Sequence, residues 1–147
     1  MRVLVQRSME ANCMVDGNVT GSITKGLVLL VGFTDGDNID TVEYLVNKII
    51  NLRIFDDENG IMNKSILETD SKEALSISQF TLYADTKKGN RPSYRNALNG
   101  NEACKLYDLF NEKLSKYIKV ATGIFGADMK ISLINDGPVT IWLEREN

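Results

Sequence analysis

Two segments of the sequence carry residue types that could do chemistry. The first, Ser78 to Leu82 (SQFTL), ends the most hydrophobic of the later strand-like segments and opens into a polar loop that runs to Pro92. Sites tend to lie where a strand gives way to a loop. An ordinary strand end, in which Ser78 and Gln79 bond to the local backbone, is the commoner meaning of such a pattern. The segment alone is therefore a weak indication of an active site.

The second segment is Asn135 to Thr140 (NDGPVT), which places a Gly-Pro pair between two predicted strands. Proline donates no backbone hydrogen bond, so within a sheet it belongs at an edge or a turn, and a hairpin turn is the simplest interpretation. About 5–6% of X-Pro bonds in folded proteins are cis, so composition leaves the isomer open. If the bond is cis, Gly137 and Pro138 would present two carbonyls on one side of a rigid turn, as acceptors for an ammonium group.

A third feature is the densest basic cluster of the chain, which surrounds Tyr94 and consists of Lys87, Lys88, Arg91 and Arg95. A solvated charged loop is the commoner explanation. The functional alternative is contact with the phosphates of an RNA end. The net charge of −3 excludes the broad positive field of a protein that grips nucleic acid nonspecifically, but it permits such a local patch.

The absence of histidine excludes several kinds of catalytic site. Ser-His-Asp and Cys-His systems and HExxH metallohydrolases all need an imidazole. Cys13 and Cys104 lack CxxC spacing and are expected to be buried free thiols, and the carboxylates are scattered, so we expect no metal. The glycines at 17, 21 and 26 lack the spacing of a phosphate-binding loop. We therefore expect catalysis that uses no cofactor and no imidazole.

The elements that must position these segments begin with strands. Alternation at Val3 and Val5 predicts a first strand, and Asp16-Gly17 predicts a hairpin turn. The apolar run Gly26 to Phe33 is typical of a strand buried on both faces. The further strands are expected at Asn12 to Val15, Asn18 to Ile23, Ala74 to Leu82, Val120 to Phe125, Met129 to Ile134 and Val139 to Leu143.

Two amphipathic helices are predicted from apolar residues at helical spacing. The first is capped by Asn38 or Asp40 and runs to about Leu52. The second follows Gly100 and carries on one face Ala103, Leu106, Tyr107, Phe110, Leu114 and Tyr117. Between the helices, Arg53 to Asn63 contains a turn at Glu58-Asn59-Gly60.

These elements predict one α+β domain over residues 1–147, with a curved, mainly antiparallel sheet or barrel and two helices. Two helices cannot cover both faces of so much sheet, so we expect dimerisation through an uncovered face. The N-terminus does not have the pattern of a signal peptide, and the longest apolar run, Leu27 to Val31, is far shorter than a membrane span. A cytosolic protein without membrane contact is therefore expected.

The motifs taken together resemble the D-aminoacyl-tRNA deacylase family, over essentially the full length and in the expected order. The segments that carry the resemblance are VLVQR with Arg7, VDGNVTGSI, RIFDDENGIMN, SQFTL at Ser78 to Leu82, KGNRPSY at Lys88 to Tyr94, TGIFGADM at Thr122 to Met129 and NDGPVTIW at Asn135 to Trp142. The resemblance implies hydrolysis of the ester of D-aminoacyl-tRNA by a homodimer, in which the NDGPVT segment of each subunit, with a cis Gly137-Pro138 bond, reaches into the partner's site.

The resemblance also implies roles for single residues. The carbonyls of Gly137 and Pro138 would hold the α-amino group and leave no space for an L side chain, so that D-residues and glycine, including glycine mischarged on tRNA(Ala), are accepted. Arg7 would brace this segment. The backbone at Ser78, Gln79 and Phe80 would bind the reacting carbonyl, and the ribose 2′-hydroxyl would assist the attack. The terminal adenosine would contact Phe125 and Met129, and the tRNA would contact Lys87, Lys88 and Arg91.

Two readings of other classes stay open. One is a dimeric domain that binds a small amine or amino acid at the Gly-Pro turn without catalysis. The other is an esterase that uses Ser78 or Thr140 as its nucleophile, although a Thr140 hydroxyl without a neighbouring base would be barely activated. If the protein is a deacylase, as the resemblance implies, its nucleic-acid partner is the 3′ acceptor end of tRNA and not DNA.

Overall fold

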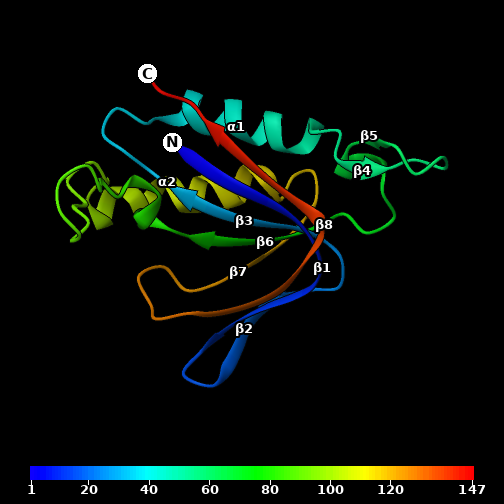
Figure 1. Cartoon of the computed structure of the whole chain (residues 1–147), viewed down its shortest axis with the longest axis horizontal. Coiled ribbons are helices and arrows are strands. Elements are labelled where there is room, and N and C mark those ends of the chain that lie inside the picture. The colour runs from blue at the N-terminus through cyan, green and yellow to red at the C-terminus, as the bar shows by residue number, and fades with distance from the viewer.

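One long strand organises the sheet of the computed structural model, which describes residues 1–147. Strand β1 (Arg2–Val15) pairs along one edge first with β3 (Gly26–Gly32) and then with β2 (Asn18–Ile23), and along its other edge with β8 (Lys130–Glu144). All three pairings are antiparallel. The first and last strands of the chain are therefore neighbours in the sheet (Figure 1).

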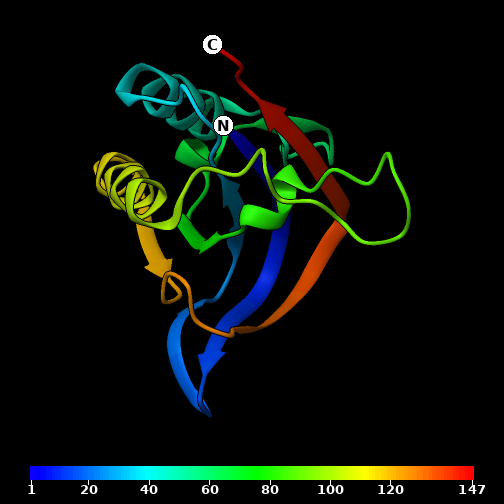
Figure 2. The ribbon, with the colours of Figure 1, turned by 90° about the vertical axis from the view of Figure 1, so that its left-hand side faces the viewer.

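The sheet continues from β3 through two parallel pairings. β6 (Glu73–Ser78) lies beside β3, and β7 (Lys119–Thr122) lies beside β6. The Thr20 hydroxyl of β2 donates to the Thr122 carbonyl of β7 at 3.2 Å, which brings the far strands together. The result is a mixed sheet that is nearly closed into a barrel (Figure 2), which confirms the predicted α+β domain.

Both helices pack on one face of this sheet. α1 (Ile39–Asn51) and α2 (Gly100–Leu114) cover Leu27, Leu29 and Val31 of β3, whereas Val28 and Leu30 pack inside the curved sheet against the opposite cluster. The run GLVLLVG is therefore buried on both faces, as predicted. A small antiparallel pair, β4 (Phe55–Asp56) and β5 (Met62–Lys64), and two 3₁₀ turns, Ile66–Glu68 and Phe80–Tyr83, complete the chain.

The helices begin at asparagine caps. The Asn38 side chain accepts from the backbone amides of Asp40 and Thr41, and the Thr41 hydroxyl accepts from the Asn38 amide, so Asn38 is the cap of α1. α2 is capped by Asn99 and ends at Leu114. The prediction that Tyr117 belongs to the packed face of α2 is wrong, because this residue follows the helix and is exposed.

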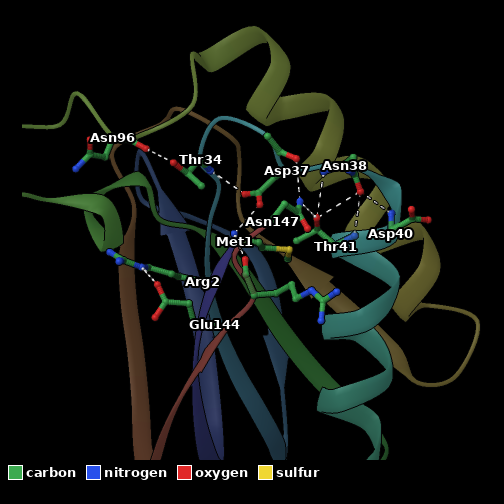
Figure 3. Close-up of polar contacts among 12 residues, drawn as sticks. Met1, Arg2, Thr34, Asp37, Asn38, Asp40, Thr41, Asn96, Glu144 and Asn147 are labelled. Carbon is green, nitrogen blue, oxygen red and sulfur yellow. Dashed lines mark hydrogen bonds and ion pairs between the residues drawn. The ribbon is translucent and has the colours of Figure 1, made fainter.

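The first residue is fixed at the top of the sheet (Figure 3). The Met1 amine donates to Asp37 Oδ1 at 2.7 Å and to the Arg145 carbonyl at 2.9 Å. The Asn147 amide donates to the Gly36 carbonyl at 2.9 Å, in the same loop. Burial lowers the pKa of the Met1 amine, although Asp37 acts in the opposite direction. These contacts join the start of β1, the loop before α1 and the end of β8.

The structure corrects the prediction for the last strands. The two segments predicted at Met129 to Ile134 and Val139 to Leu143 belong to one strand, β8, which begins at Lys130, and are not two strands joined by a hairpin. Gln6 of β1 pairs with Thr140 and Ser8 with Asn135, so residues 136–139 bulge out opposite Arg7. Pro138 is tolerated there because β8 pairs with β1 alone and its other edge is free of backbone partners.

Three smaller expectations also change. The strand predicted at Ala74 to Leu82 ends at Ser78, and Phe80–Tyr83 form a 3₁₀ turn. The strand predicted at Val120 to Phe125 ends at Thr122. Cys13 is buried as expected, but Cys104 is only partly buried.

Candidate functional site

A cavity of about 560 Å³ opens at the carboxyl ends of the parallel strands β3 and β6. In sheets with parallel strands, this is the end at which ligands tend to bind. The wall is mostly apolar and comes from four parts of the chain: residues 31–33, 77–80, 94–103 and 125–131. This end of the molecule faces the viewer in Figure 2, behind the yellow-green loop that follows the Phe80–Tyr83 turn.

The 3₁₀ turn at the cavity can approach β3 only because residue 32 is glycine. A Cβ at Gly32 would lie 2.7 Å from the Gln79 carbonyl oxygen and 3.3 Å from Leu82 Cβ. The Gln79 amide donates to the Val31 carbonyl at 2.7 Å. The Gln79 amide is therefore bonded within the protein and holds the turn to the strand.

Two neighbouring amides are left free. The first hydrogen bond of the turn runs from the Leu82 amide to the Gln79 carbonyl, so the amides of Phe80 and Thr81 have no acceptor within the protein. Both residues are exposed. Phe80 lines the cavity and Thr81 is the residue after it. Two adjacent unpartnered N–H groups beside an apolar cavity are an arrangement that can hold an oxyanion.

The opposite wall of the cavity carries Phe125 and Met129, between β7 and β8. The Phe125 ring lies 5.8 Å from the Tyr107 ring, measured between centroids. The Tyr107 hydroxyl donates to the Ser76 carbonyl at 2.7 Å, and burial raises the pKa of Tyr107. A Cβ at Gly123 would collide with the Met129 sulfur, so Met129 packs closely over that glycine.

Arg7 lies at the other end of the sheet and is 8% exposed. Its Nη1 donates to the Ile54 carbonyl at 2.8 Å and lies 3.4 Å from Asp56 Oδ1. Its Nε donates to the Asp136 carbonyl at 3.2 Å and lies 3.3 Å from Asp136 Oδ2. The guanidinium therefore joins the bulge of β8 to β4 and to the residue before it.

The bulge itself presents Gly137 and Pro138 to solvent, joined by a cis peptide bond. The Asn135 side chain spans its base: in the orientation that satisfies all its partners, the amide nitrogen donates to the Arg7 and Val139 carbonyls at 3.1 and 3.0 Å. The amide oxygen then accepts from the Thr140 hydroxyl at 2.7 Å. The hydroxyl of Thr140 is thus bonded to amide groups and contacts neither a carboxylate nor an amine.

The two regions are well separated within one chain. Arg7 pairs with Leu27 near the start of β3, whereas the cavity begins at Val31. Four residues of strand correspond to about 13 Å, and β1 and β3 lie between β8 and β6, which adds about 14 Å across the sheet. The Gly137-Pro138 bulge therefore lies far from the cavity of its own chain.

The basic loop has an anchored base and an exposed tip. Asp85 and Ser93 exchange backbone hydrogen bonds of 2.7 and 2.9 Å, which close the loop. The three basic residues Lys87, Lys88 and Arg91 lie in the exposed tip and do not line the cavity, but Tyr94, just beyond the base, does.

Of the residues singled out from the sequence, the structure brings five to one cavity: Ser78, Gln79, Phe80, Phe125 and Met129. It places a second group around the bulge: Arg7, Gly137, Pro138 and Thr140. Sequence reasoning missed the cavity positions of Tyr94 and Asp128, for which only their place inside the basic loop and the TGIFGADM segment was a signal.

No group of three or more cysteine, aspartate or glutamate side chains is arranged to hold a metal ion. Neither α-helix has the length and apolar character that a membrane-spanning helix requires.

Comparison with known proteins gives a consistent result. Residues 4–144 match the family described as D-Tyr-tRNA(Tyr) deacylase. A solved structure described as "c-Myc DNA Unwinding Element Binding Protein" is 38% identical, with a TM-score of 0.93 and 100% of both chains covered. Another, described as "Structural Analysis of a probable eukaryotic D-amino acid tRNA deacylase", is 17% identical, with a TM-score of 0.82 and 97% of each chain covered, and shares the fold.

Proposed function

Because the chain belongs to the D-Tyr-tRNA(Tyr) deacylase family and is a D-aminoacyl-tRNA deacylase, a hydrolase, we propose that its active site is composite and forms between two copies. In this proposal the cavity of one copy receives the terminal adenosine and its ester. The Gly137-Pro138 bulge of the second copy closes the site. The observation that carries the proposal is that, within one chain, the cavity and the bulge lie at opposite ends of the sheet.

The free edge of β8 supports a dimer. Unpaired strand edges are prone to association, and this one runs the length of a 15-residue strand. Two large apolar side chains stand exposed on β8, Ile134 at 60% and Trp142 at 45%. A symmetric dimer would bury the β8 edge and these apolar side chains of both copies, and it would contain two identical sites.

For the chemistry, we propose that the free amides of Phe80 and Thr81 hold the ester carbonyl oxygen as it becomes an oxyanion. Water attacks the carbonyl carbon, the bond to the ribose oxygen breaks, and that oxygen takes up a proton, with the ribose 2′-hydroxyl assisting. The products are the free D-amino acid and tRNA. An aminoacyl ester is labile enough that positioning and oxyanion donors suffice, which fits a chain without histidine.

For chiral selection, we propose that the carbonyls of Gly137 and Pro138 accept hydrogen bonds from the α-ammonium group. The substrate's α-carbon is then held with no space on the side where an L side chain would point. Glycine has no side chain to exclude, so glycyl-tRNA, including glycine mischarged on tRNA(Ala), is also a substrate. The support for this role is that Gly137 and Pro138 are exposed while Arg7 and Asn135 fix the bulge from beneath.

The direct test is single-turnover deacylation of D-tyrosyl-tRNA and L-tyrosyl-tRNA by protein treated with a chelator. We expect rapid loss of the D ester alone. Equal rates for the two esters would contradict the selection mechanism, and failure to cleave either above the spontaneous rate would favour the non-catalytic amine-binding module.

The composite site has its own test, by mixing two inactive variants. Ala127→Trp places a large ring among the cavity-lining residues, and Gly137→Ala adds a Cβ 2.8 Å from Val139 Cγ2 at a residue with φ of +122°. A mixed dimer holds one site built from the intact half of each variant. Random exchange should therefore restore about a quarter of wild-type activity. No restoration in exchanged dimers, or a monomeric wild type at micromolar concentration, would contradict the composite site.

The esterase alternative predicts a covalent acyl group on Ser78 or Thr140. The amide partners of the Thr140 hydroxyl supply no base to activate it, which argues against this alternative. Mass spectrometry after reaction with an acylating probe decides: modification of either hydroxyl together with loss of activity would favour the esterase.

We also propose that the chain acts in the cytosol and does not use duplex DNA as a partner, although one similar structure is described as a protein that binds a DNA unwinding element. The net charge of −3 opposes nonspecific binding to a duplex. An electrophoretic shift of duplex DNA at physiological salt would contradict this second point.

A further inference from the structure

Two aromatic rings stand exposed at the cavity rim, outside the roles assigned above. Phe80 and Tyr94 lie edge to face, with 5.0 Å between ring centroids and 71° between planes. Phe80 is 57% exposed and Tyr94 41% exposed, and both line the cavity. The pair thus offers ring surface to whatever enters from solvent.

Hydrogen bonds to other parts of the fold set the position of Tyr94. Ser93 is bonded to Asp85 on one side, and the Tyr94 carbonyl accepts from the Ala97 amide at 3.0 Å on the other. Two residues further on, the Asn96 carbonyl accepts from the Thr34 hydroxyl at 2.6 Å (Figure 3). Tyr94 is therefore presented from a backbone that is fixed on both sides.

The size of the cavity decides what can reach these rings. A volume of about 560 Å³ is typical of a pocket for one small ligand, here the terminal nucleoside and its aminoacyl group. The preceding nucleotide of a single-stranded RNA end must then lie at the rim. The basic residues Lys87, Lys88 and Arg91 belong to the loop that closes immediately before Tyr94. One segment therefore carries both the cations that could contact phosphates and the Tyr94 ring.

We infer that the Phe80–Tyr94 pair is a stacking platform for the base that precedes the terminal adenosine of the substrate. This inference rests on the proposed function, because it assumes that the adenosine occupies the cavity. Aromatic side chains bind single-stranded bases through the ring face, so the platform reads the presence of a base and not its identity. Tyr94 is then a binding residue that increases affinity for RNA and takes no part in cleavage.

The test compares substrates that contain or lack the preceding base. Three probes are used: D-tyrosyl-adenosine, a D-tyrosylated minihelix with a single-stranded 3′ end, and the same minihelix with an abasic site before the terminal adenosine. For Tyr94→Ala, we expect KM to rise about tenfold or more on the intact minihelix, with kcat unchanged. KM on D-tyrosyl-adenosine and on the abasic minihelix should stay at the wild-type value.

Two further variants serve as controls. Tyr94→Phe keeps the ring and should behave as the wild type. Tyr117→Ala removes an exposed tyrosine beyond the far end of α2, a helix about 22 Å long whose first residue lines the cavity, and should leave all three KM values unchanged.

Other outcomes overturn the inference. If Tyr94→Ala raises KM equally on all three probes, Tyr94 shapes the cavity and does not stack a base outside it. If it changes none of them, the ring pair has no contact with the substrate. If sedimentation shows that Tyr94→Ala separates the dimer, the pair is a subunit contact. Failure of the wild type to cleave even D-tyrosyl-adenosine would instead refute the proposed function, and the stacking platform with it.

Discussion

The two ends of the parallel strand pair β3 and β6 differ in the polarity of the residues that surround them. The carboxyl end is a mostly apolar cavity with two unpartnered amides beside it. The amino end is a polar cavity of about 440 Å³ held by charged side chains, among them Arg7, Asp136 and Lys25. Packing fixes the first end and hydrogen bonds to charged groups fix the second. The chain therefore places the cavity in which an ester can react and the rigid bulge at opposite ends of the sheet.

The largest effect should come from the polar end, with Arg7→Ala. The change leaves the Ile54 carbonyl and Asp136 without their donor and opens a void under the bulge. We expect the free energy of unfolding to fall by about 3 kcal/mol and the deacylase activity to be lost. Urea denaturation and single-turnover rates measure the two effects.

Arg7→Lys is the matched control. It keeps the charge but not the forked geometry, so it should recover part of the stability and little of the activity. If Arg7→Ala is as stable as the wild type, the polar end does not depend on this guanidinium. That result would contradict the statement that hydrogen bonds to charged groups fix this end.

The packed end is tested by Gly32→Ala. Its Cβ would lie 2.7 Å from the Gln79 carbonyl oxygen, so the 3₁₀ turn with its two free amides must shift. We expect a loss of about 2 kcal/mol of unfolding free energy and a drop in kcat/KM of at least about tenfold. Gly100→Ala is the stability control, because nothing lies within 4 Å of its Cβ and alanine favours the helix, which predicts a small gain. Unchanged kcat/KM in Gly32→Ala would show that the turn position does not matter for the reaction.

A smaller effect is expected at the basic loop of the packed end, where charges serve the ligand and not the fold. Replacing Lys87 and Lys88 together by alanine should raise KM for D-aminoacyl-tRNA severalfold and reduce the slope of log KM against log salt by about 1.4. Both side chains lie in the exposed tip, so the urea midpoint should not move. An unchanged salt slope would remove the loop tip from the RNA contact.

The smallest effect is a pH dependence at the polar end. The Thr24 hydroxyl donates to Glu73 at 2.7 Å and holds the pKa of that carboxyl below its ordinary value of 4.5. A folded-state pKa below the unfolded value stabilises the protein above about pH 4.5, and the contribution is lost as the pH falls through the folded-state pKa. Glu73→Gln should therefore be slightly less stable than the wild type at pH 7, and the difference should shrink at acidic pH, as the pH falls below about 4.5 and through the folded-state pKa.

That pH test uses urea midpoints of the two proteins at pH 7 and at acidic pH. A difference that persists at low pH would mean that Glu73 acts through packing and not through its charge.

Local signals in the sequence predict much of this architecture. The GLVLLVG run carries its own evidence of burial on both faces, and Asn38 and the apolar stripe after it define α1. These features depend on residues a few positions apart. The parallel pairing of β3 with β6 depends on segments more than 40 residues apart, for which the sequence offers no comparable signal.

The failures have the same physical origin. The sequence predicts two strands in place of β8, because the Gly137-Pro138 pair interrupts the alternation of polar and apolar residues. Only the pairing with β1 shows that residues 136–139 bulge opposite Arg7. Ser78 to Leu82 was predicted to remain extended, but the contact between Gly32 and Gln79 turns the chain. Likewise Tyr94 enters the cavity because distant backbone contacts fix its loop.

The pairing of β1 with β8 has a consequence for the order in which the chain can fold. β1 can pair with β2 and β3 as soon as the first 32 residues are available, but its other edge must wait for the last strand of the sequence. Contacts across such a separation form slowly, because a long loop must close first. Until β8 is synthesised, the nascent protein therefore carries an open edge of up to 14 residues, and this interval is when it most depends on protection from aggregation.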